Sequence, residues 1–170
     1  EAHGDAGKVM TGAAVVITDQ VNLTQADALD AITVGTVTIN SFTGTRAEFL
    51  EANTDSGKDV TSAAVVITDQ VNLTQADAVD AITGGNVTFN SFTGTKAEFD
   101  EAHGDAQKLM TSAAVVVTDQ VSLAQADTIN AYTTGTVTLT SVADTVANIT
   151  AIDALTTSEV NMTSASITVT

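Results

Sequence analysis

The chain repeats itself every fifty residues. Residues 1–50 and 51–100 are identical at 38 of 50 positions, and residues 101–150 follow in the same register without an insertion. The stretch "VVITDQVNLTQADALDAIT", which begins at Val15, returns at Val65 with one change and at Val115 in a looser form. A fixed period of this size is typical of solenoids, whose repeats bury their apolar faces against their neighbours. We therefore predict a single solenoid segment over residues 1–170, with repeat units 1–50, 51–100 and 101–150 and a partial unit 151–170.

Each unit divides into two halves of similar design. Both halves read as a short β-rich run, an Asp or Asn, an apolar residue and then a helix-like stretch. The resulting intervals of 21 and 29 residues between strands match one turn of a leucine-rich-repeat-like solenoid. Strands are predicted around Val16, Val37, Val66, Val87, Val116, Val137 and Val160, and in the final "SITVT".

The helix prediction depends on apolar spacing. In "LTQADALDAI", Leu23, Ala26, Leu29 and Ile32 recur every three residues, on one face of a short helix, and Thr24 with Asp27 suggests a capping box. A helix after every strand requires parallel strands, because the crossover returns the chain to the same edge. We predict an α/β repeat solenoid with a parallel sheet on one face and short helices on the other. The alternative is an all-β parallel β-helix in which "QADALDAI" forms a corner.

The net charge of −16 narrows the range of partners. Such a surface repels phosphate backbones and anionic lipids, so we expect no nucleic-acid partner, whereas divalent cations would suit it. No apolar run approaches the roughly 18 residues that a membrane helix needs, so no membrane span is expected. The absence of Cys excludes a disulfide framework and a thiolate zinc site. Because the chain begins with Glu1 and not Met, we interpret it as a segment of a longer protein.

A polar residue follows each predicted strand, and stacked turns would align these residues at one corner. Asp and Asn favour turns because they bond neighbouring backbone groups, and this is the interpretation we prefer. The alternative is a row of oxygen ligands for Ca²⁺, although neither the nonapeptide calcium pattern nor an EF-hand loop is present. The candidate metal ligands are Asp19, Asn40, Asp69, Asn90 and Asp119, and Thr140 holds the same position in the last half-unit.

Threonine is abundant along the predicted strands: "TVT", "NVT" and "TVT" recur at 36–38, 86–88 and 136–138. An outward array of Thr is a feature of some ice-binding β-solenoids. Here the alternate strands read "VVIT", "VVIT" and "VVVT", so Val would interrupt the array at every second rung. Threonine is also a good exposed strand residue, and we prefer that explanation.

No singular constellation suggests catalysis. His3 and His103 occupy the same repeat position, within "AHGDA", and Asn53 replaces them in the middle unit. Nearly every other polar residue has a counterpart fifty residues away, whereas an active site needs one specific arrangement. We therefore expect a non-enzymatic protein with no catalytic residue and no cofactor, Ca²⁺ aside.

The stretch from Ser141 to Ser164, "SVADTVANITAIDALTTSEVNMTS", resembles repeats in very large, acidic, Thr/Ala-rich exoproteins of cyanobacteria and other aquatic bacteria. The resemblance is most specific in "DTVAN" and "DALTT". It implies a secreted or surface-displayed repeat protein and carries over no catalytic residue.

Together these features predict a structural or surface-display element, a spacer, fibre or adhesin stalk of a larger extracellular bacterial protein. A calcium-stabilised adhesin and an ice-binding solenoid are the alternatives. An exposed terminal strand such as "SITVT" would allow end-to-end self-association.

Overall fold

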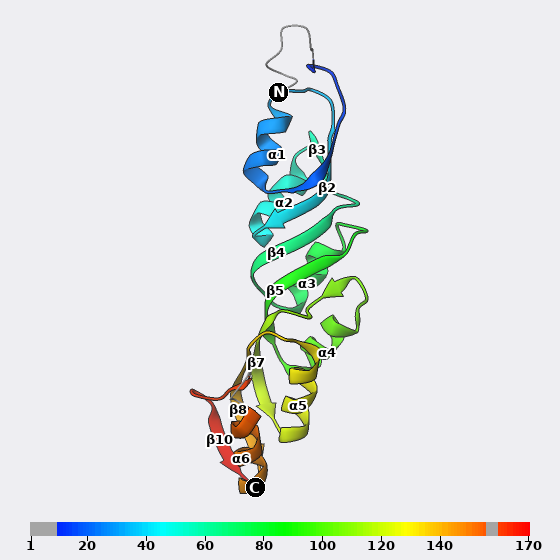
Figure 1. Cartoon of the computed structure of the whole chain (residues 1–170). Coiled ribbons are helices and arrows are strands. Elements are labelled where there is room, and N and C mark those ends of the chain that lie inside the picture. Colours follow the sequence, from blue (N-terminus) through cyan, green and yellow to red (C-terminus); the bar gives the residue numbers. More distant parts are fainter. Residues whose placement is uncertain (1–9, 156–159) are drawn as a thin grey trace. The chain divides into compact units, whose positions relative to one another are not determined.

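Strands and short helices alternate along the whole of the described chain (Figure 1). The computed structural model describes residues 10–155 and 160–170. Its elements are β1 (Val15–Val21), α1 (Leu23–Asp30), β2 (Val37–Gly44), α2 (Arg46–Thr54), β3 (Lys58–Asp59), β4 (Ala64–Val71), α3 (Leu73–Asp80), β5 (Val87–Gly94), α4 (Lys96–Gly104), β6 (Lys108–Leu109), β7 (Ala114–Val121), α5 (Leu123–Tyr132), β8 (Val137–Asp144), α6 (Val146–Leu155), β9 (Val160–Asn161) and β10 (Ser166–Val169). The predicted α/β class is confirmed, and helices take the stretches that the all-β alternative assigned to corners.

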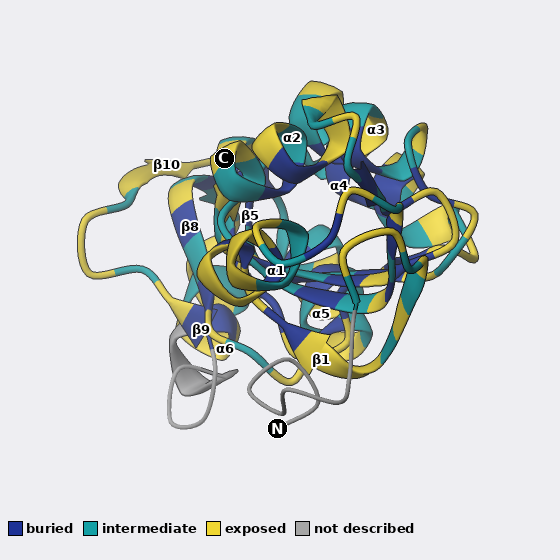
Figure 2. Cartoon of the chain, turned by 90° about the horizontal axis from the view of Figure 1, so that it is seen from above, coloured by how far each residue is buried: buried dark blue, intermediate teal, exposed yellow. Residues whose placement is uncertain are grey.

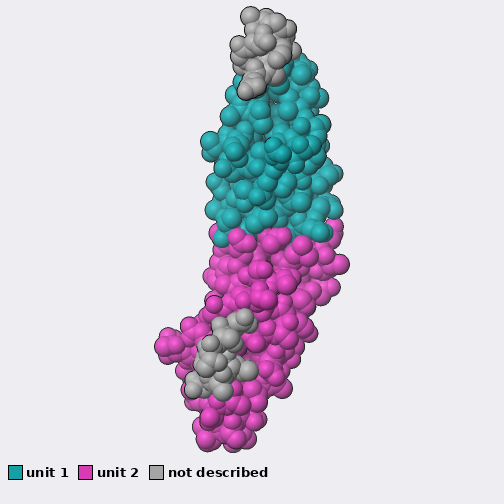
Figure 3. All heavy atoms as spheres, in the orientation of Figure 1, with its two compact units in different colours: residues 1–68, 78–87 teal, residues 69–77, 88–170 magenta. Residues whose placement is uncertain are grey.

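The chain forms two compact units, coloured separately in Figure 3. Unit 1 comprises residues 1–68 and 78–87, and unit 2 comprises residues 69–77 and 88–170. The divisions fall inside β4, α3 and β5, and not at the starts of the sequence repeats after residues 50 and 100.

In unit 1 the strands β1, β2 and β4 are parallel neighbours, and the short strand β3 extends the pairing of β2. Helix α1 connects β1 to β2, and α2 leads from β2 towards β4, so each crossover contains a helix as the parallel arrangement requires. Val15 lies opposite Val37, and Phe42 lies opposite Val65.

In unit 2 the same arrangement recurs at the fifty-residue period of the sequence. The strands β5, β7, β8 and β10 are parallel neighbours, while β6 pairs with β5 and β9 with β8. Val115 lies opposite Val137 and Phe92 opposite Val115, so the register of unit 1 is reproduced residue for residue. The short strands β3, β6 and β9 begin at Lys58, Lys108 and Val160. Of these three, only the strand near Val160 was predicted from the sequence.

Alternating burial along the strands builds the core, and Figure 2 shows buried and exposed positions following one another on β8. The inward side chains of β2 and β8 are almost fully buried: Val37, Ile39 and Phe42 in β2, and Val137, Leu139 and Val142 in β8. Phe42 packs against Phe49 of α2 with ring centroids 5.5 Å apart, and Phe92 packs against Phe99 of α4 at 5.8 Å. These layers of aliphatic and Phe side chains explain how a chain without Trp fills its interior.

Helix α1 starts two residues earlier than the predicted capping box would place it. Asn22 is its N-cap: the Asn22 side chain accepts a hydrogen bond from the Gln25 N–H, and the Gln25 side chain accepts one from the Asn22 N–H, both at 3.0 Å. The Thr24–Asp27 box is therefore wrong. The predicted apolar stripe is correct in part: Leu23 and Ala26 are buried, whereas Leu29 is half-buried and Ile32 lies beyond the end of the helix.

Candidate functional site

The candidate metal ligands lie within strands, not at corners. Each of these positions has three to five strand residues before it and at least two after it: Asp19, Asn40, Asp69, Asn90 and Asp119, together with Thr140. The prediction of a shared corner is wrong because the strands do not end where the β-branched run ends. They continue to a second apolar residue, such as Val21 in β1 and Phe42 in β2, which is also buried.

A β-bulge accounts for the polar pair inside the longer strands. Ile17 lies opposite Ile39, but the next paired residues are Gln20 and Ser41, so β1 carries one extra residue at Thr18–Asp19. The same shift occurs between Val117 and Gln120 of β7. Because of the bulge, the apolar residues on both sides of the polar pair face inward. In the sequence the polar pair resembles a turn.

At the bulge of β7, the Asp119 side chain caps the start of a helix. Its carboxylate accepts a hydrogen bond of 2.8 Å from the backbone N–H of Lys96, the first residue of α4. In the same way Asp144, at the end of β8, accepts one of 3.0 Å from the N–H of Leu123, the first residue of α5. The first N–H groups of a helix have no partner within the helix, so these carboxylates stabilise helices from a neighbouring strand.

The hydrogen bonds also affect ionisation. The Leu123 N–H, the Asn148 side chain and the Thr145 N–H all donate to Asp144, and together they lower the pKa of its carboxyl group. Within residues 10–155 and 160–170, no three His, Cys, Asp or Glu side chains gather closely enough to hold a metal ion. The calcium interpretation therefore stays a prediction without a built site, and the geometry favours a capping role for Asp119.

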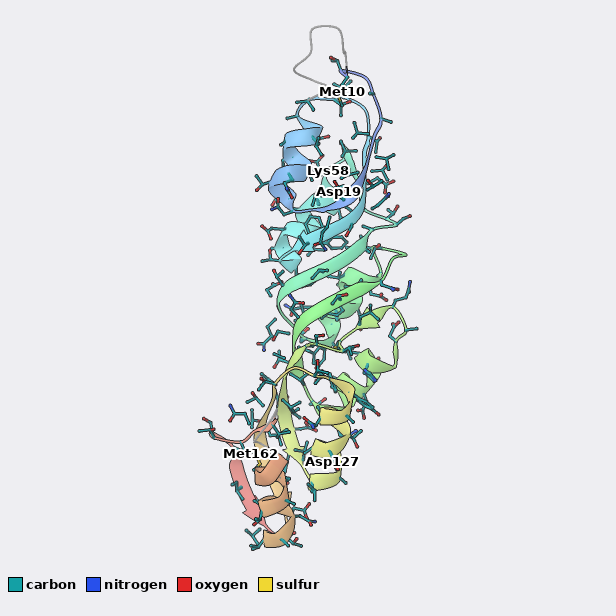
Figure 4. All side chains as sticks on the ribbon, viewed as in Figure 1. Met10, Asp19, Lys58, Asp127 and Met162 are labelled. Atoms are coloured by element: carbon teal, nitrogen blue, oxygen red, sulfur yellow. The ribbon has the colours of Figure 1, made fainter. Side chains whose placement is uncertain are left out.

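The most unusual polar side chain of unit 1 is Lys58, on β3 (Figure 4). Its side chain is only 3% exposed, and its Nζ lies 2.8 Å from Asp27 Oδ1 of α1. It also donates to Asp55 in the turn after α2. We call Lys58, Asp27 and Asp55 the first lysine clasp; it ties two successive helical crossovers to one strand.

Unit 2 repeats this cluster. Lys108 on β6 lies 2.7 Å from Asp77 and 2.9 Å from Asp105, and its side chain is 8% exposed. We call these three residues the second lysine clasp. The counterpart of Asp27 and Asp77 in the third repeat is Asp127 of α5, an exposed residue (Figure 4) that forms no ion pair within the described part of the chain.

The clasps keep their lysines charged. Burial disfavours the ammonium form of Lys58, but its hydrogen bonds to Asp27 and Asp55 outweigh that effect and raise its pKa, and Lys108 behaves in the same way. The hydrogen bond from Lys58, followed by that from the Gly57 N–H, lowers the pKa of Asp55. A nucleophilic lysine needs a lowered pKa, so this chemistry suits a structural ion pair and not covalent catalysis.

A second repeated set of hydrogen bonds, which we call the threonine turn lock, stabilises the turns before β2, β5 and β8. The hydroxyl groups of Thr83 and Thr133 donate to the carbonyl oxygens of Ala63 and Ala113, at 2.6 and 2.7 Å, and both threonines are buried. Each hydroxyl also accepts a hydrogen bond from the N–H of the glycine two residues later. Thr33 forms the same contacts with Ala13 and Gly35.

His103 of α4 stacks on Tyr132 of α5, with ring centroids 4.1 Å apart and an angle of 14° between the planes. This pair breaks the repeat, because Asn53 and Ile82 hold the corresponding positions in the preceding unit. His3 lies outside the described residues. The stack joins two neighbouring helices of unit 2, and His103 is half-buried there.

The sequence indicates the two lysine clasps only when the positions of the basic residues are compared between repeats. The five basic residues occupy only two repeat positions: Lys8, Lys58 and Lys108 share one, and Arg46 and Lys96 share the other. In a chain of net charge −16, a basic residue kept at one repeat position indicates a specific acidic partner. The partners Asp27 and Asp77 recur at the same interval of fifty residues.

No protein-family model matches the chain, and comparison with curated proteins and with solved structures finds no significant relative. None of the described helices combines the length and the apolar character needed to cross a membrane. The interpretation of function therefore depends on the chain's own contacts.

Proposed function

We propose that the chain is a non-enzymatic solenoid segment whose role is mechanical, as a spacer, fibre or adhesin stalk of a larger extracellular bacterial protein. The observation that carries this proposal is the recurrence of whole contact networks at the sequence period. The clasp, the threonine turn lock and the Phe–Phe pair each recur fifty residues apart with nearly the same distances.

The repeated contacts have a common purpose in this proposal. The clasp and the threonine contact link residues that are distant in sequence: Thr83 and Ala63 are 20 residues apart, and Lys58 pairs with Asp27 of an earlier helix. Contacts between adjacent turns are what give a solenoid its nearest-neighbour stability. The polar residues that recur are thereby engaged in joining turns, which leaves them without a catalytic assignment.

Extracellular display is supported by the resemblance of residues 141–164 to acidic bacterial exoproteins and by the net charge of −16, which favours solubility. The calcium-stabilised adhesin is the weaker candidate because Asp119 already accepts a hydrogen bond from α4. Thermal unfolding with Ca²⁺ and with excess chelator distinguishes the two: the structural proposal expects the same Tm in both, and a sharp fall in chelator would favour the adhesin.

The solenoid itself is tested by inserting one, two or three further copies of residues 51–100 after residue 100. Each copy adds two long parallel strands at a spacing of about 4.8 Å, so the longest dimension measured by small-angle X-ray scattering should grow by about 10 Å per copy. The control inserts a shuffled segment of the same composition. Growth that is irregular, or equal to that of the shuffled control, would refute the solenoid.

A further inference from the structure

Three rings meet where α4 and α5 pack together in unit 2. Phe99 and His103 lie one turn apart on α4, and Tyr132 is the last residue of α5. The centroid of the His103 ring lies 4.1 Å from that of Tyr132 and 6.2 Å from that of Phe99, with angles of 14° and 23° between the planes. Phe99 is fully buried, whereas His103 and Tyr132 are half-buried. We call these three residues the aromatic stack; it holds the imidazole face to face against the phenol ring.

The aromatic stack departs from the repeat. In the preceding repeat the three positions are held by Phe49, Asn53 and Ile82, so that only the buried Phe is common to both. The lysine clasp, the threonine turn lock and the Phe–Phe pair recur at the sequence period, whereas the stack does not. Histidine is the side chain that changes its charge between about pH 5 and pH 8. The contact between α4 and α5 therefore contains a titratable group that the repeated contacts lack.

The end of α4 favours a positive charge on His103. This residue lies in the last turn of the helix, where the carbonyl groups without helical partners carry a partial negative charge. Asp105 follows as the C-cap residue. The N–H of Gln107 and the ammonium group of Lys108 donate hydrogen bonds to Asp105 and lower the pKa of its carboxyl group. Asp105 therefore stays negative over the whole range in which histidine titrates.

The elements around α4 add further negative charge. In unit 2, α4 packs against α5, β6 and β7. Lys108 is the one cation on these three elements, and it is paired with Asp77 and Asp105. The other charged side chains on these elements and on α4 itself are Lys96, Glu98, Asp100, Glu101, Asp119 and Asp127. Since Lys96 is paired with Asp100, both lysines are matched by carboxylates, and the remaining charges favour an imidazolium.

The Tyr132 ring supplies the attraction that depends on protonation. A cation over the face of an aromatic ring, within about 6 Å of its centre, is attracted by the electrons of the ring, and neutral imidazole lacks this attraction. We propose that His103 is a pH-sensitive link between α4 and α5, which strengthens as the pH falls from about 8 to about 5. The unfolded chain offers the imidazolium neither the helix end nor the ring. The stabilisation is therefore present at low pH and is lost as the pH rises through the range in which histidine titrates.

A double-mutant cycle on the full chain tests the link. His103→Asn and Tyr132→Ile introduce the residues that the preceding repeat carries at these positions, so both suit the fold. The native chain, the two single variants and the double variant are unfolded with urea at pH 8 and at pH 5. The coupling between the two positions, expressed as an equilibrium constant, should be roughly threefold larger at pH 5. Equal coupling at both pH values, as a purely structural contact would give, or larger coupling at pH 8, would overturn the proposal.

Tyrosine fluorescence gives a second readout, which reports on the stack directly. The chain has one Tyr and no Trp, so the emission of Tyr132 is not masked by another tyrosine or by tryptophan. An imidazolium group quenches an excited phenol more strongly than neutral imidazole does. The emission of the native chain should therefore fall between pH 8 and pH 5, and His103→Asn should abolish this fall.

His3→Asn is the matched control for the fluorescence measurement, because it removes the other histidine of the chain by the same substitution. This variant should retain the fall in emission. A fall that persists in His103→Asn, or that disappears in His3→Asn, would show that His103 is not the group that titrates beside Tyr132 and would overturn the proposal.

Discussion

At the scale of single residues, a threonine hydroxyl and a glycine close the same turn in successive repeats. The glycine is needed because the chain passes directly over a backbone carbonyl group. A Cβ atom built on Gly85 would lie 2.3 Å from the Ala63 carbonyl oxygen, and on Gly135 it would lie 2.2 Å from that of Ala113. Backbone atoms cannot rotate away as a flexible side chain can, so any larger residue must displace the turn.

Gly85→Ala should therefore lower the free energy of unfolding by about 2 kcal/mol, in the range of overpacking substitutions. Gly84→Ala provides a matched control one residue away, because its Cβ would meet nothing closer than the Thr61 carbonyl oxygen at 3.7 Å. That variant should differ from the native chain by less than about 0.5 kcal/mol. Urea denaturation of both measures the difference, and equal losses would show that close approach is not the cause.

The lysine clasp predicts an asymmetry between its partners. Lys58→Met keeps the buried stem and leaves Asp27 and Asp55, which are 50% and 38% exposed, in contact with water. Its cost should be about 1 kcal/mol or less. Asp27→Asn/Asp55→Asn instead leaves a buried ammonium without a counter-charge and should cost more than Lys58→Met.

Urea denaturation again supplies the measurement for the clasp. Lys96→Met is the control, because among the described residues Lys96 forms one ion pair, with Asp100, and its side chain is more exposed than that of Lys58. A double Asn variant that is as stable as Lys58→Met would mean that the Lys58 ammonium finds water when its partners are removed.

At the scale of elements, helices depend on side chains from outside their own segment. α2 and α4 each carry a capping box within the element, Thr45 with Glu48 and Thr95 with Glu98. α4 also receives Asp119 from β7, and α5 receives Asp144 from β8. A helix of eight to ten residues is marginal by itself, so these caps and the buried face of each helix keep it folded.

Asp119→Ala should lower the free energy of unfolding by about 1 kcal/mol, as expected for loss of a side-chain cap. Asp119→Asn retains an oxygen that can accept the hydrogen bond from the Lys96 N–H, so its loss should be smaller. Hydrogen exchange of the α4 amides locates the effect, because the cap acts on the first turn. Equal losses for Ala and Asn would show that the negative charge, and not the hydrogen bond, is what stabilises α4.

At the scale of the whole molecule, the shifted pKa values set the pH range in which the clasps contribute. The lowered pKa values of Asp55 and Asp105 mean that their contribution is present above the unfolded value of about 4 and is lost as the pH falls through the folded values. The raised pKa values of Lys58 and Lys108 mean that theirs is present below about 10.4 and is lost as the pH rises through the folded values.

The difference in stability between the native chain and Lys58→Met/Lys108→Met should therefore be constant from about pH 5 to about pH 9. It should shrink below about pH 4 and above about pH 10.5. General charge repulsion in a chain of net charge −16 affects the native protein and the variant almost equally, because their net charges differ by only two. The difference between their stabilities therefore reduces its influence. A difference that changes steadily across the neutral range would show that the clasps do not account for the native chain's response to pH.

The alternation of strand and helix follows from the sequence alone, because β-branched runs and a three-residue apolar spacing are local properties. The strand positions around Val16, Val66 and Val116 and the helix that begins at Leu23 are correct for that reason. Parallel pairing also follows, since a helical crossover permits little else.

Only the tertiary structure decided where the strands end and which polar residues are buried. Asp19 reads as a turn residue until Val21 is seen to face the core beyond a bulge. The burial of Lys58 could be seen only in the fold, which brings Asp27 and Asp55 to it from other elements. Both outcomes depend on groups that are distant in sequence, and no local pattern indicates that these groups come together. The sequence repeats indicate which positions recur, and only the tertiary structure determines which residues they contact.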